Sequence, residues 1–148
     1  MNLSWDGEEN IPAAKATVWT FINDPAKIAG CLPDVESTAI TGSSSFDAVV
    51  RVSLGPVRGK FKFKVSLAPQ ADRNRMDLKV SGGGLGSVVD LAAGADLAPA
   101  GENATTLKWH GDASIRGPAA TVGGRVLDAQ AHRVIGTTFE NVKKALSV

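Results

Sequence analysis

The side chains that could support catalysis or metal binding are few and widely separated in this 148-residue sequence. The two histidines, His110 and His132, have polar neighbours, and the single cysteine, Cys31, has no second cysteine with which to share a metal ion. A structural zinc site needs four ligands and a catalytic one three, and a cysteine nucleophile needs an activating base. We therefore expect solvated histidines, a buried and inert cysteine, no metal site and no catalytic residue.

The glycine-rich run Gly82-Gly83-Gly84-Leu85-Gly86 has some likeness to a phosphate-binding loop. It lacks the Lys-Ser/Thr pair that completes a P-loop, and the pattern after it is typical of a strand, not of a helix. We therefore interpret the run as a connection between two strands.

Glu9 is the acidic residue that matters most for an enzymatic interpretation. It has the same parity as the apolar residues Leu3, Trp5 and Ile11 in an alternating segment. Either a bulge or the end of the strand shifts the register there, which is the interpretation we favour, or the carboxylate points inward. An inward carboxylate would be the candidate general acid or base of an enzyme.

A row of basic residues alternates along one predicted strand, and all of its members project from the same face of the sheet. We call this row the basic stripe, and it consists of Arg58, Lys60, Lys62 and Lys64. It could dock on an acidic partner or on anionic lipid headgroups. The interpretation we favour is a solvated outer face, balanced by cross-strand acids such as Asp47 and Asp77.

Composition narrows the class of protein. The chain is 43% hydrophobic and 21% charged with a net charge of +1, which is an ordinary mixture for one globular domain over residues 1–148. A near-neutral chain lacks the concentrated basic surface that nucleic-acid binding needs. We find no signal-peptide pattern and no run approaching the roughly 18 apolar residues of a membrane span. With a single cysteine, the expectation is a cytoplasmic protein.

Hydrophobic periodicity predicts an α+β order of elements. A strand over residues 3–11 is followed by a helix after Pro12, which Asn23-Asp24-Pro25 ends, and by a short helix to Gly30. Between Val35 and Arg116 the period is two, so we expect about six further strands in an antiparallel sheet with one buried face.

The period changes once more near the C-terminus. Helical spacing from about Ala119 to Leu146 predicts an amphipathic helix of about 28 residues, roughly 40 Å long. Its apolar stripe must lie against the buried face of the sheet. A strongly curved sheet around one helix can leave an apolar hollow that holds a ligand. The residues that we predict to line this pocket are Phe21, Leu32, Val52, Leu54, Phe61, Phe63, Val65, Leu78, Leu91, Leu107, Trp109, Leu127, Gln130 and Val134.

Several motifs resemble, in order, those of the carbon monoxide dehydrogenase G-subunit family, and together they cover nearly the whole chain. They are Ile11-Pro12-Ala13, Val18-Trp19, Asn23-Asp24-Pro25, Cys31-Leu32-Pro33, Leu54-Gly55-Pro56-Val57-Arg58-Gly59-Lys60-Phe61, Gly117-Pro118-Ala119-Ala120 and Gly123-Gly124-Arg125-Val126-Leu127 ahead of Phe139.

The resemblance implies a START-like, helix-grip fold of the polyketide cyclase-type superfamily, in which about seven strands wrap a long C-terminal helix over a hydrophobic cavity. It implies a non-enzymatic carrier of a lipid or prenylated quinone such as menaquinone, with no covalently bound cofactor. Gln130 or Trp109 would contact a quinone carbonyl. The implied partner is carbon monoxide dehydrogenase or a related molybdenum hydroxylase, in quinone delivery or membrane recruitment at the inner face of the cell membrane.

Two departures from the family pattern bear on these expectations. Asp34 stands where the family often has a small residue, so the mouth of the pocket would differ. Many members also carry a membrane-seeking extension beyond the position of Val148, and a chain without it would not anchor itself in that way. Two alternative functions stay open: an assembly or recruitment module that docks through the basic stripe, and a cyclase- or hydrolase-like enzyme that uses Glu9.

Overall fold

Seven strands form one antiparallel sheet in our computed structural model, which describes residues 1–147. Val148, the last residue of the predicted domain, lies outside the described residues. The strands from β2 to β7 each pair with the next in sequence, and β1 pairs with β7 to complete the order β1-β7-β6-β5-β4-β3-β2. Their bounds are β1 Asn2–Ile11, β2 Val35–Gly42, β3 Ser45–Leu54, β4 Val57–Gln70, β5 Arg75–Gly84, β6 Ser87–Gly101 and β7 Ala104–Arg116.

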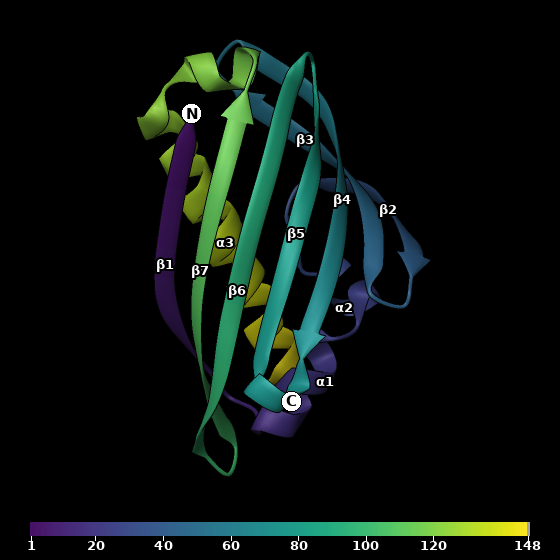
Figure 1. The fold of residues 1–148 in the computed structure, drawn as a ribbon, viewed down its shortest axis with the longest axis vertical. Coiled ribbons are helices and arrows are strands. Elements are labelled where there is room, and N and C mark those ends of the chain that lie inside the picture. The colour runs from purple at the N-terminus through teal and green to yellow at the C-terminus, as the bar shows by residue number, and fades with distance from the viewer. Residues whose placement is uncertain (148) are drawn as a thin grey trace.

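The helices cover one side of this sheet (Figure 1). The long helix α3 runs along the concave side, and the two short helices α1 and α2 lie together near one end. Their bounds are α1 Lys15–Ile22, α2 Pro25–Ala29 and α3 Gly124–Leu146, with single 3-10 turns at η1 Ala71–Arg73 and η2 Pro118–Val122. The predicted helix-grip arrangement is therefore confirmed.

The expected bulge near Glu9 is wrong, because β1 is regular throughout. Its register with β7 runs without a shift from Asn2 opposite Ser114 to Ile11 opposite Thr105. Glu9 therefore keeps the parity of its apolar neighbours and points toward the concave side. The inward carboxylate is tolerated because the Lys143 side chain of α3 reaches it.

The long helix begins later than its periodicity predicts. Gly123 has a φ of +97°, a left-handed conformation that ends η2 and separates it from α3. The helix has 23 residues and is about 35 Å long at the standard rise. The first helix likewise begins at Lys15, because Ala14 has extended backbone with a ψ of 149°.

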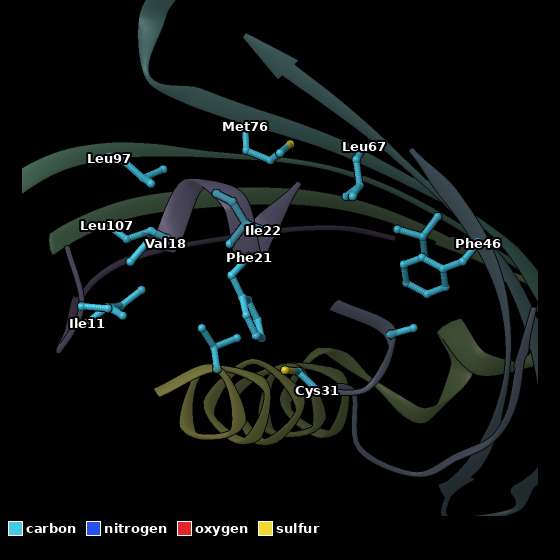
Figure 2. Packing of buried hydrophobic residues seen from close by; sticks show 14 of the residues in the cluster. Ile11, Val18, Phe21, Ile22, Cys31, Phe46, Leu67, Met76, Leu97 and Leu107 are labelled. Carbon is cyan, nitrogen blue, oxygen red and sulfur yellow. The ribbon is translucent and has the colours of Figure 1, made fainter. Parts of the chain in front are cut away.

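The buried side chains form two separate clusters rather than one continuous core. The first joins α1, α2 and the adjacent halves of the strands; Figure 2 shows Phe21 and Cys31 projecting between α3 and the sheet in this cluster. The second lies at the other end, where the β3–β4 hairpin packs on η2 and the first turn of α3. We call the region between the two clusters the centre of the grip.

The convex face of the sheet carries a polar cluster across β5, β6 and β7. The Arg75 guanidinium donates to Asp77 over 2.8 Å and to Asp96 over 3.2 Å, and lies 3.4 Å from His110. The hydrogen bond to Asp77 is the main reason why the pKa of Arg75 is raised. Beneath it, a Cβ on Gly94 would lie 2.3 Å from the Arg75 Nη2 atom. An alanine there would therefore force the guanidinium away from its place across these strands.

We predict that Gly94→Ala lowers the free energy of unfolding by about 1–3 kcal/mol, because the new methyl group expels the Arg75 side chain. The matched control is Gly136→Ala, since Gly136 lies within α3 and has no atom within 4 Å of an added Cβ. That variant should gain up to about 1 kcal/mol from helix propensity. Urea unfolding followed by circular dichroism measures both changes, and a loss of equal size in the two variants would contradict the role of Gly94.

Candidate ligand-binding site

The centre of the grip is lined by small and half-buried apolar residues. Leu91 and Ala93 on β6 and Val134 on α3 are half-buried, and they belong to neither core cluster. Gly111 on β7 lies beside them, because a Cβ there would be 3.7 Å from both the Ala93 Cβ and the Leu91 Cδ1 atoms. Well-packed interiors leave little accessible apolar surface. The middle of the concave face therefore keeps apolar surface that the protein's own side chains cover only in part.

The predicted pocket residues divide into two groups by burial. Half of them pack within the core clusters, and these are Phe21, Val52, Leu54, Phe61, Val65, Leu107 and Leu127. The other half are only half-buried, and these are Leu32, Phe63, Leu78, Leu91, Trp109, Gln130 and Val134.

Two polar contacts fasten α3 along the edge strand β1. The indole Nε1 of Trp5 donates to Asp128 over 2.6 Å, and the Lys143 ammonium lies 2.8 Å from the Glu9 carboxylate. The second contact is partly shielded, since the Lys143 and Glu9 side chains are 36% and 28% exposed. Glu9 therefore faces inward as a paired carboxylate, not as a free acid or base.

The opposite margin of α3 is tethered to the segment after α2. Asn141 donates to the Cys31 carbonyl over 2.9 Å, and Arg133 forms an ion pair with Asp34. Asp34 has a φ of +60°, a left-handed conformation that aspartate tolerates better than most residues. Cys31 itself is buried, and burial raises the pKa of its thiol, in agreement with an inert cysteine. Asp34, the departure from the family pattern, is thus a tether for the long helix.

A polar cleft of about 500 Å³ opens beside this tether, between α3 and strands β2 and β3. Its lining residues are Asp34, Val35, Glu36, Arg51, Ser53, Gln130 and Arg133. Hydrogen bonds from Lys60 and then Arg51 lower the pKa of Glu36. Gln130 is the predicted pocket residue that lines this cleft. The polar members were missed because they come from distant segments and share no periodic pattern.

The indole of Trp109 places a hydrogen-bond donor in the interior. Its Nε1 atom is buried with no hydrogen-bond acceptor among residues 1–147. The indole lies over Gly7, where a Cβ would be 2.7 Å from the ring, and its centroid is 6.0 Å from that of Phe139. An unpaired buried N–H costs about 1–3 kcal/mol. Such a group in a ligand cavity is a candidate donor to a bound acceptor.

We predict that Trp109→Phe costs only the packing of the lost five-membered ring, about 1–2 kcal/mol, because the removed N–H has no acceptor among residues 1–147. Trp5→Phe is the matched control, and it should lose about 0.5–1.5 kcal/mol with the hydrogen bond to Asp128. Guanidinium unfolding of the two variants tests the difference. A loss at Trp109 that exceeds the loss at Trp5 by more than the difference in buried ring area explains would mean that the Trp109 N–H is paired in solution.

The basic stripe is exposed along its whole length on the convex face of β4. Lys60 pairs with Glu36 at 3.0 Å, but Lys62 and Lys64 have no acidic oxygen within 4.0 Å among the described residues. Asp47 lies opposite Lys64 in the register, as expected. Asp77 lies opposite Ala68 and pairs with Arg75, so the expectation that it balances the stripe is wrong.

Neither a metal site nor a membrane-spanning helix is found in the part of the chain that the structure describes. No group of three or more His, Cys, Asp or Glu side chains there could hold a metal ion. No helix within residues 1–147 is long and apolar enough to cross a membrane. The glycine-rich run ends β5 and forms its turn to β6, which confirms the strand connection expected from the sequence.

A curved seven-stranded sheet gripping a long C-terminal helix defines a START-like protein, and solved structures agree. A conserved protein from Geobacillus kaustophilus has a TM-score of 0.88 at 23% identity, covering 98% of this chain and 95% of its own. A START superfamily protein from Mycobacterium smegmatis has 0.73 at 13% identity, covering 97% of each chain. The Zhui aromatase/cyclase from Streptomyces sp. R1128 has 0.71 at 14% identity, covering 99% and 94%.

The family itself follows from the sequence model for the G subunit of carbon monoxide dehydrogenase (CoxG), which matches residues 7–147. The chain belongs to this CoxG family. No curated protein has a significant match to it.

Proposed function

We propose that the protein binds a lipophilic molecule between its sheet and α3 and performs no chemistry on it. The observation that carries this proposal is the half-buried apolar centre of the grip around Leu91, Ala93 and Val134. A ligand that removed about 300 Å² of apolar surface from water there would gain about 7 kcal/mol before the costs of association. Family membership favours a prenylated quinone such as menaquinone as the ligand.

The polar end of such a ligand would meet Trp109 or Gln130. The buried Trp109 N–H has no acceptor among the described residues, so a quinone carbonyl would relieve its desolvation penalty. Gln130 lines the polar cleft and accepts from Arg133 over 3.4 Å, which leaves its amide hydrogens available for a carbonyl. The isoprenoid tail would then lie along the apolar residues of the centre.

A binding role is favoured over catalysis by the state of Glu9. An acid or base in the grip must exchange protons with its substrate, but the Glu9 carboxylate is held by Lys143. Enzymes such as the Zhui aromatase/cyclase share the fold, and a shared fold does not carry an activity with it. We therefore infer a carrier, with no bound cofactor other than its cargo.

The partner that we propose is carbon monoxide dehydrogenase or a related molybdenum hydroxylase, on the ground of the family to which the chain belongs. The protein would deliver quinone to this enzyme or bring the enzyme to the membrane where quinone dissolves. We expect a cytoplasmic protein that makes peripheral contact with the inner face of the cell membrane.

We predict that Ala93→Phe weakens menaquinone binding at least about ten-fold, because a phenyl ring would occupy the centre of the grip. Ala92→Phe is the matched control, since Ala92 is the exposed neighbour on the opposite face of β6. Quenching of tryptophan fluorescence gives both affinities, and native mass spectrometry of the purified protein identifies any retained molecule. Recovery of no lipophilic molecule, together with no quinone binding by the unaltered protein, would refute the carrier.

Lys62 and Lys64, which have no acidic oxygen within 4.0 Å among residues 1–147, favour a second candidate, a docking module for an acidic partner enzyme. Lys62→Glu with Lys64→Glu should then abolish capture of the molybdenum enzyme in a pull-down while menaquinone binding survives. The control is Lys108→Glu, an exposed lysine on β7. Unchanged capture by the double variant would rule this candidate out.

A further inference from the structure

The two edges of the sheet are protected to very different degrees. Strands β1 and β2 end the strand order, so among the described residues each pairs with a strand on one side only. Along β1 the charged residues Asp6, Glu8 and Glu9 follow closely, and α3 lies beside the strand, tied to it through Lys143. Charge and a covering element are common means by which a protein prevents pairing at an edge. The β1 edge has both.

The β2 edge lacks such protection over most of its length. From Ser37 to Gly42 the strand carries no charged residue and no proline, and every residue in that range is exposed. Its register with β3 is regular from Ser37 to Ile40, between two irregularities at its ends. Figure 1 shows β2 at the margin of the sheet, with no strand beyond it in the part of the chain that is described. An edge of this composition is a template for another strand.

Ile40 shows what the open edge leaves uncovered. It lies opposite Phe46 in the register, and Phe46 is fully buried in the first core cluster, so Ile40 points to the concave, apolar face. Even so, Ile40 is 52% exposed. A strand added beside β2 would cover the open side of Ile40 without rearranging the fold.

We propose that β2 pairs antiparallel with β2 of a second copy of this chain, so that the two sheets join across a two-fold axis at Ala39. Ala39 is the midpoint of the uncharged stretch from Ser37 to Thr41. Around this axis Thr38 lies opposite Ile40 of the partner subunit, and the same pair forms twice. Each exposed isoleucine thereby gains a β-branched neighbour across the new strand pair.

The charges around β2 favour a second copy as the occupant. Antiparallel pairing about Ala39 sets the two Glu36 side chains at opposite ends of the new strand pair, where each faces Gly42 of the partner subunit and not another acid. Each Glu36 is also neutralised within its own chain by Arg51 and Lys60. Like charges directly opposite would destabilise the pair, and this arrangement has none. A charged peptide, in contrast, would find no opposite charge between Ser37 and Gly42.

Ala39→Cys tests the axis itself. Residues directly opposite in an antiparallel pair have Cα atoms about 4.5–5.5 Å apart, which a disulfide can span. The single native cysteine, Cys31, is buried, so the introduced thiol is the accessible one. Under mild oxidation we expect a covalent dimer on a non-reducing gel. Thr41→Cys is the matched control on the same edge, because its two copies would lie about 14 Å apart. It should cross-link at least about ten-fold more slowly.

Ala39→Lys tests the association without a covalent bond. It would place two ammonium groups opposite each other at the axis, which destabilises the pair. Within one chain the new lysine would lie beside Asp47, so the melting temperature should not fall. Sedimentation velocity from about 1 to about 200 µM should show a dimer of the unaltered protein that grows with concentration, and a dissociation constant at least about ten-fold higher for Ala39→Lys. Ala39→Thr, uncharged and β-branched, is the matched control and should still dimerise.

Three results would overturn the proposal. The first is an unaltered protein that stays monomeric over this range of concentration. The second is equal cross-linking of Ala39→Cys and Thr41→Cys. The third is cross-linking of Ala39→Cys to an unrelated protein in place of a second copy, which would assign the β2 edge to a strand from another chain. The pairing needs no ligand, so its outcome is independent of menaquinone binding.

Discussion

The structure depends on how α3 is held. Its most extensive approach to the sheet is along β1, where Trp5 meets Asp128 and Glu9 meets Lys143. On the other margin it is tied by Arg133 to Asp34. A helix fastened at its margins by polar contacts need not press its whole apolar stripe into the centre of a curved sheet. The core accordingly divides into clusters at either end, and the apolar residues between them stay half-buried.

The curved sheet depends on a close approach of neighbouring backbones at the glycine-rich run of β5. A Cβ on Gly82 would lie 1.9 Å from the Lys62 carbonyl oxygen, and one on Gly83 would lie 2.0 Å from the Ser87 carbonyl oxygen. The glycine-rich run is thus needed where the backbone of β5 comes close to both of its neighbours.

The same run links the interior to the surface. These glycines are followed at once by Leu85, whose left-handed backbone places an apolar side chain at the tip of the turn.

Local pattern alone determined the order of the elements, the single antiparallel sheet, the glycine connection and the exposed basic stripe, because alternation and helical spacing are properties of neighbouring residues. Only the tertiary structure decided that the Glu9 side chain points inward, that Asp34 pairs with Arg133 and that the N–H of Trp109 is buried. Glu9 and its partner Lys143 are 134 residues apart, so no local pattern could reveal that an inward acid would be neutralised. The sequence likewise predicted which apolar residues face the interior. It could not separate the residues buried in the clusters from those left accessible, because burial depends on where α3 is held.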